Sequence, residues 1–386
     1  MKKICVLTAT RAEYGLLSSL IKQLKKYSDI QVEIVVTGMH LSPEFGLTYK
    51  EIEADGEIIA EKIPILLSAD TPDAISKTMG LAMISFADYF ERSKPDMLVV
   101  LGDRYETAAI CCAAVNARIP IAHLHGGETT EGAVDEAYRH SITKMSYLHF
   151  TSTEAYRKRV IQMGENPERV FNVGAIGVEN VLKTPVFSKK ELEENLQIEL
   201  DSPYAVVTFH PVTLEEFSAE NQITQLLDAI KAFPDMKFFF TKANSDADGR
   251  IINKKIAEFS NENPNCILFD SLGMKRYLSL VSYCDVVIGN SSSGLIEVPS
   301  FKIPTINIGD RQKGRIAGSS VLNTEVKKEN IIASIKKALS KEFKKECSCS
   351  SNPYYMENTS GKISEIIREF LVNDGIDLKK TFYDFE

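Results

Sequence analysis

The chain has 386 residues, which is enough for two domains of ~150–200 residues each. Hydrophobic residues make up 44% and charged residues 25% of the sequence, which is typical of a globular protein and argues against disorder. The net charge of −8 argues against a nucleic-acid partner, because binding a phosphate backbone needs clustered excess Lys and Arg, although a local basic cluster can still bind one small anion.

The N-terminus and the cysteines indicate the compartment. The apolar run Ile4–Leu7 is too short for a signal peptide, and no later stretch supplies the ~18 apolar residues that span a bilayer. Five of the seven cysteines lie in apolar or mixed patterns, which favours buried thiols in a reducing compartment. We therefore expect a cytoplasmic protein with no membrane partner.

The N-terminal half alternates short β-branched runs with polar turns and helical patterns. Helices are expected after the turns: one ends at about Lys26, a second ends at about Val115, and a third begins near Asp135. Apolar strands that alternate with helices are typical of a parallel sheet covered on both faces. The expected strands are Ile4–Thr8, Val32–Thr37, Met97–Leu101 and Ile119–Leu124.

A similar alternation restarts after about residue 180. The segment Lys183–Leu200 is charged and contains Pro185, which suits a linker and a capping helix. We predict an α/β protein of two Rossmann-like domains, residues 1–180 and 181–360, whose strand C-termini face one shared crevice. The expected strands of the second domain are Tyr204–Phe209, Lys237–Thr241, Cys266–Phe269, Val286–Gly289 and Thr305–Ile308.

Polar side chains gather directly after the strands, where the turns of an open parallel sheet face a ligand. Exposure alone explains any one polar turn, but several turns carrying Arg, His, Asp, Glu or clustered Ser point together to a binding site. The clearest signal is Ser291–Ser293, which follows a buried strand and precedes a predicted helix. Backbone N–H groups at a helix start, with hydroxyl donors, bind phosphate well, whereas a plain N-cap explains only one serine. The basic segment Gly309–Arg315 would add contacts to a diphosphate, although alone it would be a solvated loop.

The sequence lacks the motifs of the common cofactor sites. It has no Walker loop, and Thr8–Gly15 does not fit GxGxxG, which disfavours ATP and NAD chemistry. It also has no HExxH motif, paired-Cys unit or carboxylate-rich cage. We expect no cofactor and no tightly held metal.

Candidate acid/base residues follow the same strands. Asp103 comes directly after a fully apolar strand, where a nearby dry core can raise the pKa of a carboxyl group. His210 follows the first strand of the second domain, where a core histidine is less expected. The turn His123–Glu128 is a further candidate, while His40 is interpreted as structural.

The helix from Asp135 carries a second group. Its spacing puts Asp135 and Arg139 on one face, as it does Glu136 and His140, although surface ion pairs also explain both spacings. His149 is interpreted as structural, and Arg104 is left open as a substrate or salt-bridge residue.

Five segments together resemble one family over nearly the whole chain, from about residue 4 to about residue 370. That family is the hydrolysing UDP-N-acetylglucosamine 2-epimerases of bacterial nonulosonic (sialic or legionaminic) acid synthesis. The segments are Thr10–Gly15, Leu101–Glu106, His123–Glu128, Arg139–Lys144 and Ile308–Arg315.

The resemblance implies a GT-B architecture, in which a UDP-sugar lies in the cleft between two Rossmann-like domains. It also implies a C-terminal helix and tail, residues 361–386, that pack back on the first domain. UDP would be eliminated across C1–C2 of the sugar, and the resulting 2-acetamidoglucal would be hydrated to N-acetylmannosamine without a cofactor. Family members are commonly dimers or tetramers, so a homo-oligomer is expected.

The resemblance also implies roles for residues at matching positions. Arg11 resembles a diphosphate-contacting arginine, Asp103 and Asp135 resemble acid/base carboxylates, and His210 resembles a histidine near the diphosphate. The nucleotide-binding positions are matched by Ser291, Ser292, Ser293, Glu297 and Arg311.

One catalytic position departs from the family pattern. Many members read His-Ile-Glu-Gly-Gly-Glu, and the first glutamate is assigned a catalytic role, whereas His125 stands there in this sequence. Either His125 or the nearby Glu128 transfers the proton, and histidine is competent for this near neutral pH.

Several alternatives stay open. The same reaction on UDP-N,N′-diacetylbacillosamine would serve legionaminic acid synthesis, and no residue in the sequence distinguishes the two sugars. A GT-B glycosyltransferase would need an acceptor, and a non-catalytic UDP-sugar sensor would turn over nothing. A non-hydrolysing epimerase is disfavoured by the segments at Arg139–Lys144 and Asp310–Arg315.

Overall fold

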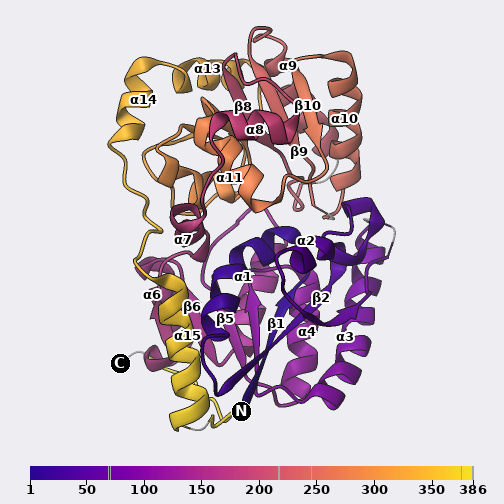
Figure 1. Ribbon diagram of the computed structural model, residues 1–386, viewed down its shortest axis with the longest axis vertical. Helices are drawn as coiled ribbons and strands as arrows, with labels where there is room; N and C mark the ends of the chain where they lie inside the picture. Colours follow the sequence, from indigo (N-terminus) through magenta and orange to yellow (C-terminus); the bar gives the residue numbers. More distant parts are fainter. Residues whose placement is uncertain (68, 70, 216–217, 245, 375, 385–386) are drawn as a thin grey trace. The chain divides into compact units, whose positions relative to one another are not determined.

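The computed structural model describes residues 1–67, 69, 71–215, 218–244, 246–374 and 376–384. The chain divides into two units, each with its own sheet (Figure 1). Unit 1 comprises Met1–Glu128, Asp135–Asn180 and Tyr354–Glu386, and unit 2 comprises Thr129–Val134 and Val181–Pro353. Among the helices in these described ranges, none is long and apolar enough to cross a membrane.

Unit 1 is built on a parallel sheet with the strand order β3-β2-β1-β4-β5-β6-β7, seven strands within the described residues. The four strands expected from the sequence are present, and β3, β6 and β7 were not expected. The bounds are β1 Lys2–Thr8, β2 Ile30–Thr37, β3 Ile59–Ile63, β4 Met97–Leu101, β5 Ile121–Leu124, β6 Leu148–Thr151 and β7 Val170–Asn172.

Helices cover both faces of this sheet (Figure 1). Alternate residues of β1 point to opposite faces: Ile4 and Val6 belong to one apolar core, and Cys5 and Leu7 belong to the other. The helices are α1 Arg11–Leu24, α2 Tyr49–Ala54, α3 Pro72–Ser93, α4 Tyr105–Asn116, α5 Asp135–Met145, α6 Glu154–Gln162 and α15 Thr359–Glu369, with α7 Ile176–Lys183 leading into unit 2.

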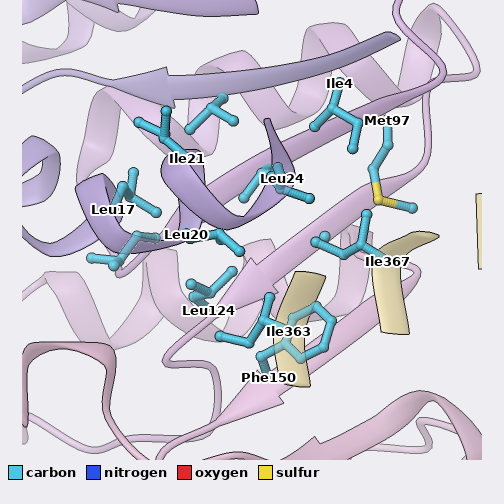
Figure 2. Packing of buried hydrophobic residues seen from close by; sticks show 14 of the residues in the cluster. Ile4, Leu17, Leu20, Ile21, Leu24, Met97, Leu124, Phe150, Ile363 and Ile367 are labelled. Atoms are coloured by element: carbon cyan, nitrogen blue, oxygen red, sulfur yellow. The ribbon is translucent and has the colours of Figure 1, made fainter. Parts of the chain in front are cut away.

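Helix α1 shows why these segments fold as they do. A capping box closes its first turn, since the Thr10 side chain accepts from the Glu13 N–H and the Glu13 side chain accepts from the Thr10 N–H. Its apolar residues recur at helical spacing from Leu17 to Leu24 and face the core (Figure 2). Ile363 and Ile367 of α15 enter the same cluster, so the two ends of the chain build one core.

Unit 2 is built on a second parallel sheet with the order β10-β9-β8-β11-β12-β13, six strands within the described residues. The five strands expected from the sequence are present, and the partly exposed β13 was not expected. The strands are β8 Tyr204–Thr208, β9 Lys237–Thr241, β10 Cys266–Phe269, β11 Val286–Gly289, β12 Thr305–Ile308 and β13 Val321–Thr324. The helices are α8 Lys189–Leu196, α9 Ala219–Ile230, α10 Gly249–Glu262, α11 Gly273–Tyr283, α12 Ser293–Ile296, α13 Lys328–Ala338 and α14 Lys341–Ser348.

The short segment Thr129–Val134 belongs to unit 2, although it joins two parts of unit 1. The Glu131 N–H donates to the Lys313 carbonyl at 3.2 Å, and the Val134 N–H donates to Thr213 Oγ1 at 3.0 Å. A Cβ on Gly132 would lie 2.8 Å from the Asp310 carbonyl oxygen, so only glycine allows this close approach. The segment is therefore anchored to the loops after β8 and β12.

Candidate active site

In unit 1 the candidate residues lie at the C-terminal edge of the sheet. Strands β1, β4 and β5 are neighbours, so the turns that follow them meet at one edge. Arg11 is the first residue of α1, Asp103 lies between β4 and α4, and Asp135 is the first residue of α5. His125 and Glu128 lie in the turn after β5.

Arg139 of α5 is the centre of a buried charge network. Its guanidinium is only 1% exposed, forms an ion pair with Asp103 and lies 2.7 Å from Glu136 Oε2. It also donates to the Glu128 carbonyl at 3.1 Å. The Asp103 side chain is therefore held by a buried cation and is 25% exposed, rather than lying against the apolar core alone as the sequence suggested. Glu136 also contacts His140 Nε2 at 3.0 Å, as expected from the helical spacing.

His123 ties this network to the end of β4. Its Nε2 lies 2.7 Å from the Gly102 carbonyl, and its Nδ1 lies 3.2 Å from Thr143 Oγ1 of α5. Burial lowers the pKa of His123 to about 3, so the ring is neutral and Nε2 donates to the carbonyl. His123 thus fixes the backbone that precedes Asp103 against the helix that carries Arg139.

The turn after β5 places the two residues whose roles the sequence left open in direct contact. His125 Nδ1 lies 3.0 Å from Glu128 Oε1, and both side chains are buried. The same Glu128 oxygen accepts a hydrogen bond from Ser152 Oγ at 2.6 Å. Ser152 follows β6, the next strand of the sheet, and was not a candidate from the sequence.

A second charged cluster contains Arg104, whose role the sequence left open, together with Glu13 and Glu106, which were not candidates. Glu13 Oε2 accepts from the Ala9 and Thr10 N–H groups at 2.6 and 3.2 Å, and Arg104 Nε donates to Glu106 Oε1 at 2.6 Å. Burial, together with the Glu106 carboxylate, raises the pKa of Glu13 to about 7, and Arg104 opposes this shift. Arg104 is therefore a salt-bridge residue in this structure.

In unit 2 the end of β8 is joined to the end of β11 by a reciprocal pair. The His210 N–H donates to Asn290 Oδ1 at 2.7 Å, and Asn290 Nδ2 donates back to the His210 carbonyl at 2.8 Å. The Asn244 N–H lies 3.4 Å from His210 Nδ1, which therefore accepts. In a neutral ring the proton is then on Nε2, so His210 presents a donor.

The serine turn follows β11 as predicted, but its helix is short. Ser291–Ser293 lead into α12, a single turn that ends at Ile296, and Glu297 is its C-terminal cap. Pro299 follows and cannot continue the α-helical hydrogen bonds. Ser293 Oγ lies 3.0 Å from the Tyr277 hydroxyl. The turn therefore offers hydroxyls and local N–H groups rather than the dipole of a long helix.

A single glycine makes this turn possible. Gly289 has φ 138°, and a Cβ there would overlap the Thr208 carbonyl oxygen on the neighbouring strand. No other residue fits, so the break between β11 and the serines is fixed by steric exclusion.

The basic loop after β12 is held against the same turn. Arg311 Nη1 and Gln312 Nε2 both donate to the Asn290 carbonyl, at 3.1 and 2.9 Å. Arg315 Nη1 donates to Gln312 Oε1 at 2.6 Å. The loop also borders a pocket of about 380 Å³ at the ends of β12 and β13. The structure therefore brings Arg311 beside the serine turn.

Comparison with known proteins places the chain in a family. Residues 22–368 match the family model described as UDP-N-acetylglucosamine 2-epimerase. The chain belongs to this family. It is 44% identical over 344 residues to the GDP/UDP-N,N′-diacetylbacillosamine 2-epimerase (hydrolyzing) of Campylobacter jejuni, covering 89% of each chain. It is 43% identical over 385 residues to the polysialic acid biosynthesis protein P7 of Escherichia coli, covering 100% of this chain and 98% of that protein.

Two solved structures share the fold of this chain. The UDP-GlcNAc 2-epimerase of Neisseria meningitidis bound to UDP-GlcNAc has a TM-score of 0.78 and 21% identity, covering 96% of this chain and 99% of that chain. The Staphylococcus aureus MnaA–UDP structure also has a TM-score of 0.78, with 18% sequence identity, and the match covers 95% of this chain and 96% of that chain. The predicted family and the predicted class of two parallel α/β domains are both confirmed.

Some polar residues around the candidate site of this epimerase-family chain gave little signal in the sequence. Glu13 forms part of the pattern Thr-x-x-Glu, which indicates a helix cap and nothing more. Ser152 and Asn290 are single polar residues after strands, and their partners are distant in the sequence. Asn290 directly follows the predicted strand Val286–Gly289, whereas Ser152 follows β6, which was not expected from the sequence.

Proposed function

We propose that this protein is a hydrolysing 2-epimerase that converts UDP-N-acetylglucosamine and water into N-acetylmannosamine and UDP, for sialic-acid-type sugar synthesis. The observation that carries the proposal is the similarity over nearly the full chain to hydrolysing epimerases and to the polysialic acid biosynthesis protein P7. The charged groups at the strand ends of both units supply the chemistry that this reaction needs.

The diphosphate is assigned to the arginines and to the serine turn. Ser291, Ser292 and Ser293 donate from hydroxyl and backbone groups, and Arg311 lies beside them on the Asn290 carbonyl. The proposal adds Arg11 as a second guanidinium and gives the ribose hydroxyls to the Glu297 carboxylate.

The chemical step needs both charge stabilisation and proton transfer. The C2 hydrogen of the sugar is not acidic, so the C1–O bond breaks ahead of deprotonation while donors stabilise the departing diphosphate. His210, which presents Nε2–H, is assigned to this stabilisation. Protons are then removed from C2 on one face and added on the other, which calls for two acid/base groups. We assign this work to residues among Asp103, Asp135, His125 and Glu128.

A second substrate is supported by specific relatives. The Legionella pneumophila protein at 35% identity is named for UDP-N,N′-diacetylbacillosamine, and the Campylobacter jejuni protein at 44% identity is named for the GDP or UDP form of that sugar. That sugar differs from N-acetylglucosamine at C4 and C6, away from the bonds that react. The alternative therefore uses the same residues and the same mechanism.

Incubation with each UDP-sugar in D₂O, followed by NMR of the products, tests the proposal. Deuterium at C2 of a free mannosamine-type sugar is expected, and the faster substrate identifies the physiological one. UDP release with unchanged C2 stereochemistry would indicate simple hydrolysis and overturn the mechanism. A sugar still attached to UDP would indicate a non-hydrolysing epimerase. Turnover only with an added acceptor would indicate a glycosyltransferase.

The family also supports a homo-oligomer. We propose a homodimer or homotetramer in the cytoplasm, and sedimentation of the purified protein measures the assembly directly. A monomer at micromolar concentration would contradict this proposal.

A further inference from the structure

The His125 ring has one nitrogen held and one without a partner. Nδ1 contacts Glu128, whereas Nε2 is buried and has no hydrogen-bond partner within the described residues. The residue itself is only 7% exposed. A buried polar atom without a partner is costly, so its retention beside a charge network points to a ligand or a reacting group.

The contacts of Glu128 define the tautomer of that ring. Glu128 Oε1 already accepts the Ser152 hydroxyl at 2.6 Å, and a carboxylate can only accept. The proton between Glu128 and His125 therefore lies on Nδ1. In the neutral ring Nε2 then carries a lone pair, so it is a proton acceptor. A base oriented by a carboxylate, which is itself held by a third group, is a recurring catalytic arrangement.

The backbone of the turn is held in a strained shape that fixes this ring. His125 has φ 66°, in the left-handed region that costs about 1–2 kcal/mol for a side-chain residue. Its N–H donates to the Phe150 carbonyl at 2.8 Å. A Cβ on Gly127 would lie 2.6 Å from the Tyr156 carbonyl oxygen, and Arg159 donates to the Gly127 carbonyl at 2.6 Å. Strain kept by such surroundings is typical of functional turns.

We infer that His125 Nε2 is the base that removes the C2 proton, and that Glu128 and Ser152 are positioning residues that transfer no proton. This inference rests on the proposed function. As the C1–O bond breaks, its electron pair leaves with UDP, and the C2–H pair becomes the C1=C2 double bond while Nε2 takes the proton. The acid group on the opposite face then delivers a proton to C2, and water adds its hydroxyl to C1. The remaining proton of that water restores the acid group. The His125 proton passes to solvent.

Chemical rescue tests the role of His125. His125→Gly removes the ring and keeps the backbone, because glycine adopts φ 66° without strain. Loss of turnover by about 10²–10⁴-fold is expected, with partial recovery on adding imidazole and recovery that varies with the pKa of substituted imidazoles. Imidazole should not restore Asp103→Asn or Glu128→Gln, which are the matched controls. A His125→Gly variant that binds UDP normally but gains nothing from imidazole would overturn the inference.

Kinetics and NMR separate positioning from proton transfer at Glu128. Glu128→Gln places an amide donor against Nδ1, so the ring should switch to the Nε2–H tautomer and kcat should fall with little change in KM. ¹⁵N-histidine spectra, assigned by comparison with His125→Gly, should show Nδ1–H in the wild type and Nε2–H in Glu128→Gln. An Nε2–H wild-type tautomer would contradict the inference. Failure of the wild type to turn over any UDP-sugar would contradict the proposed function instead. The spectra would still show which nitrogen of His125 carries the proton beside Glu128.

Discussion

Asp103→Asn separates the structural and the catalytic roles of the carboxylate after β4. The amide keeps the size and one acceptor of Asp103 but removes its charge and its capacity to exchange a proton. Arg139 keeps Glu136 at 2.7 Å and the Glu128 carbonyl at 3.1 Å, so its buried charge is not left alone. We therefore expect the variant to fold.

The two expected losses differ in size. Breaking a buried ion pair costs about 3–5 kcal/mol and an exposed pair less than about 1 kcal/mol. Because Asp103 is 25% exposed and Arg139 keeps a second carboxylate, a loss of about 1–2 kcal/mol in folding free energy is expected. Removing an acid/base group lowers turnover by about 10²–10⁴-fold, which corresponds to roughly 3–5 kcal/mol.

Three measurements on one preparation test this. Urea denaturation gives the stability, calorimetric titration gives the UDP affinity, and NMR in D₂O gives the turnover. UDP affinity should change by less than about threefold while turnover falls by at least about 10²-fold. Asp29→Asn is the control. Asp29 directly precedes β2, at the N-terminal end of that strand, and pairs with Arg368, so breaking this ion pair should leave turnover unchanged. Equal losses of affinity and turnover in Asp103→Asn would make Asp103 a binding residue and refute the reasoning.

Three further changes test the fold around the site. Gly127→Ala forces a Cβ to within 2.6 Å of the Tyr156 carbonyl oxygen and should lower the folding free energy, measured by urea denaturation, by about 1–3 kcal/mol. The control Gly80→Ala lies on an open face of α3 and should be neutral or stabilising. Equal effects of the two changes would contradict the steric argument. Ile367 is fully buried in the core of unit 1, so Ile367→Ala should lower the folding free energy by about 2–5 kcal/mol. Calorimetry should show a lower transition temperature for unit 1 alone. A shift confined to unit 2 would contradict the membership of Ile367 in that core. The pKa of Glu13 is raised from 4.5 to about 7 in the folded state. Between these two pH values the folded chain binds a proton that the unfolded chain has lost. The contribution of Glu13 to folding stability therefore falls as the pH rises to about 7, by up to about 3 kcal/mol. Relative to Glu13→Gln, the wild type should therefore lose stability between pH 5 and pH 8, and a constant difference would contradict the shift.

Strands with long apolar runs could be predicted from the sequence, whereas the edge strands β3, β7 and β13 and the short interior strand β6 were missed. The run Met97–Leu101 is buried on both faces, so its residues are uniformly apolar. Strand β3 at one edge reads Ile-Ala-Glu-Lys-Ile and is mostly accessible, so it carries no such run. Strand β13 at the edge of the other sheet is partly exposed in the same way.

The location of the candidate site could be predicted better than its contacts. Asp103, His210 and Ser291–Ser293 were selected because they follow predicted strands, and each of them follows a strand in the structure. The contacts join distant positions: Arg139 to Asp103 across 36 residues and His210 to Asn290 across 80 residues. Such pairs depend on how helices pack on the sheet, which no local spacing encodes.

The return of α15 to the first sheet has a consequence for how the chain matures during synthesis. All residues of unit 2, 129–134 and 181–353, leave the ribosome before Tyr354. Unit 1 still lacks Ile363 and Ile367 at that stage, so the part of its core that α15 completes is not yet covered. Domains usually mature in order from the N-terminus. In this chain the second sheet can therefore form before the core of unit 1 is complete.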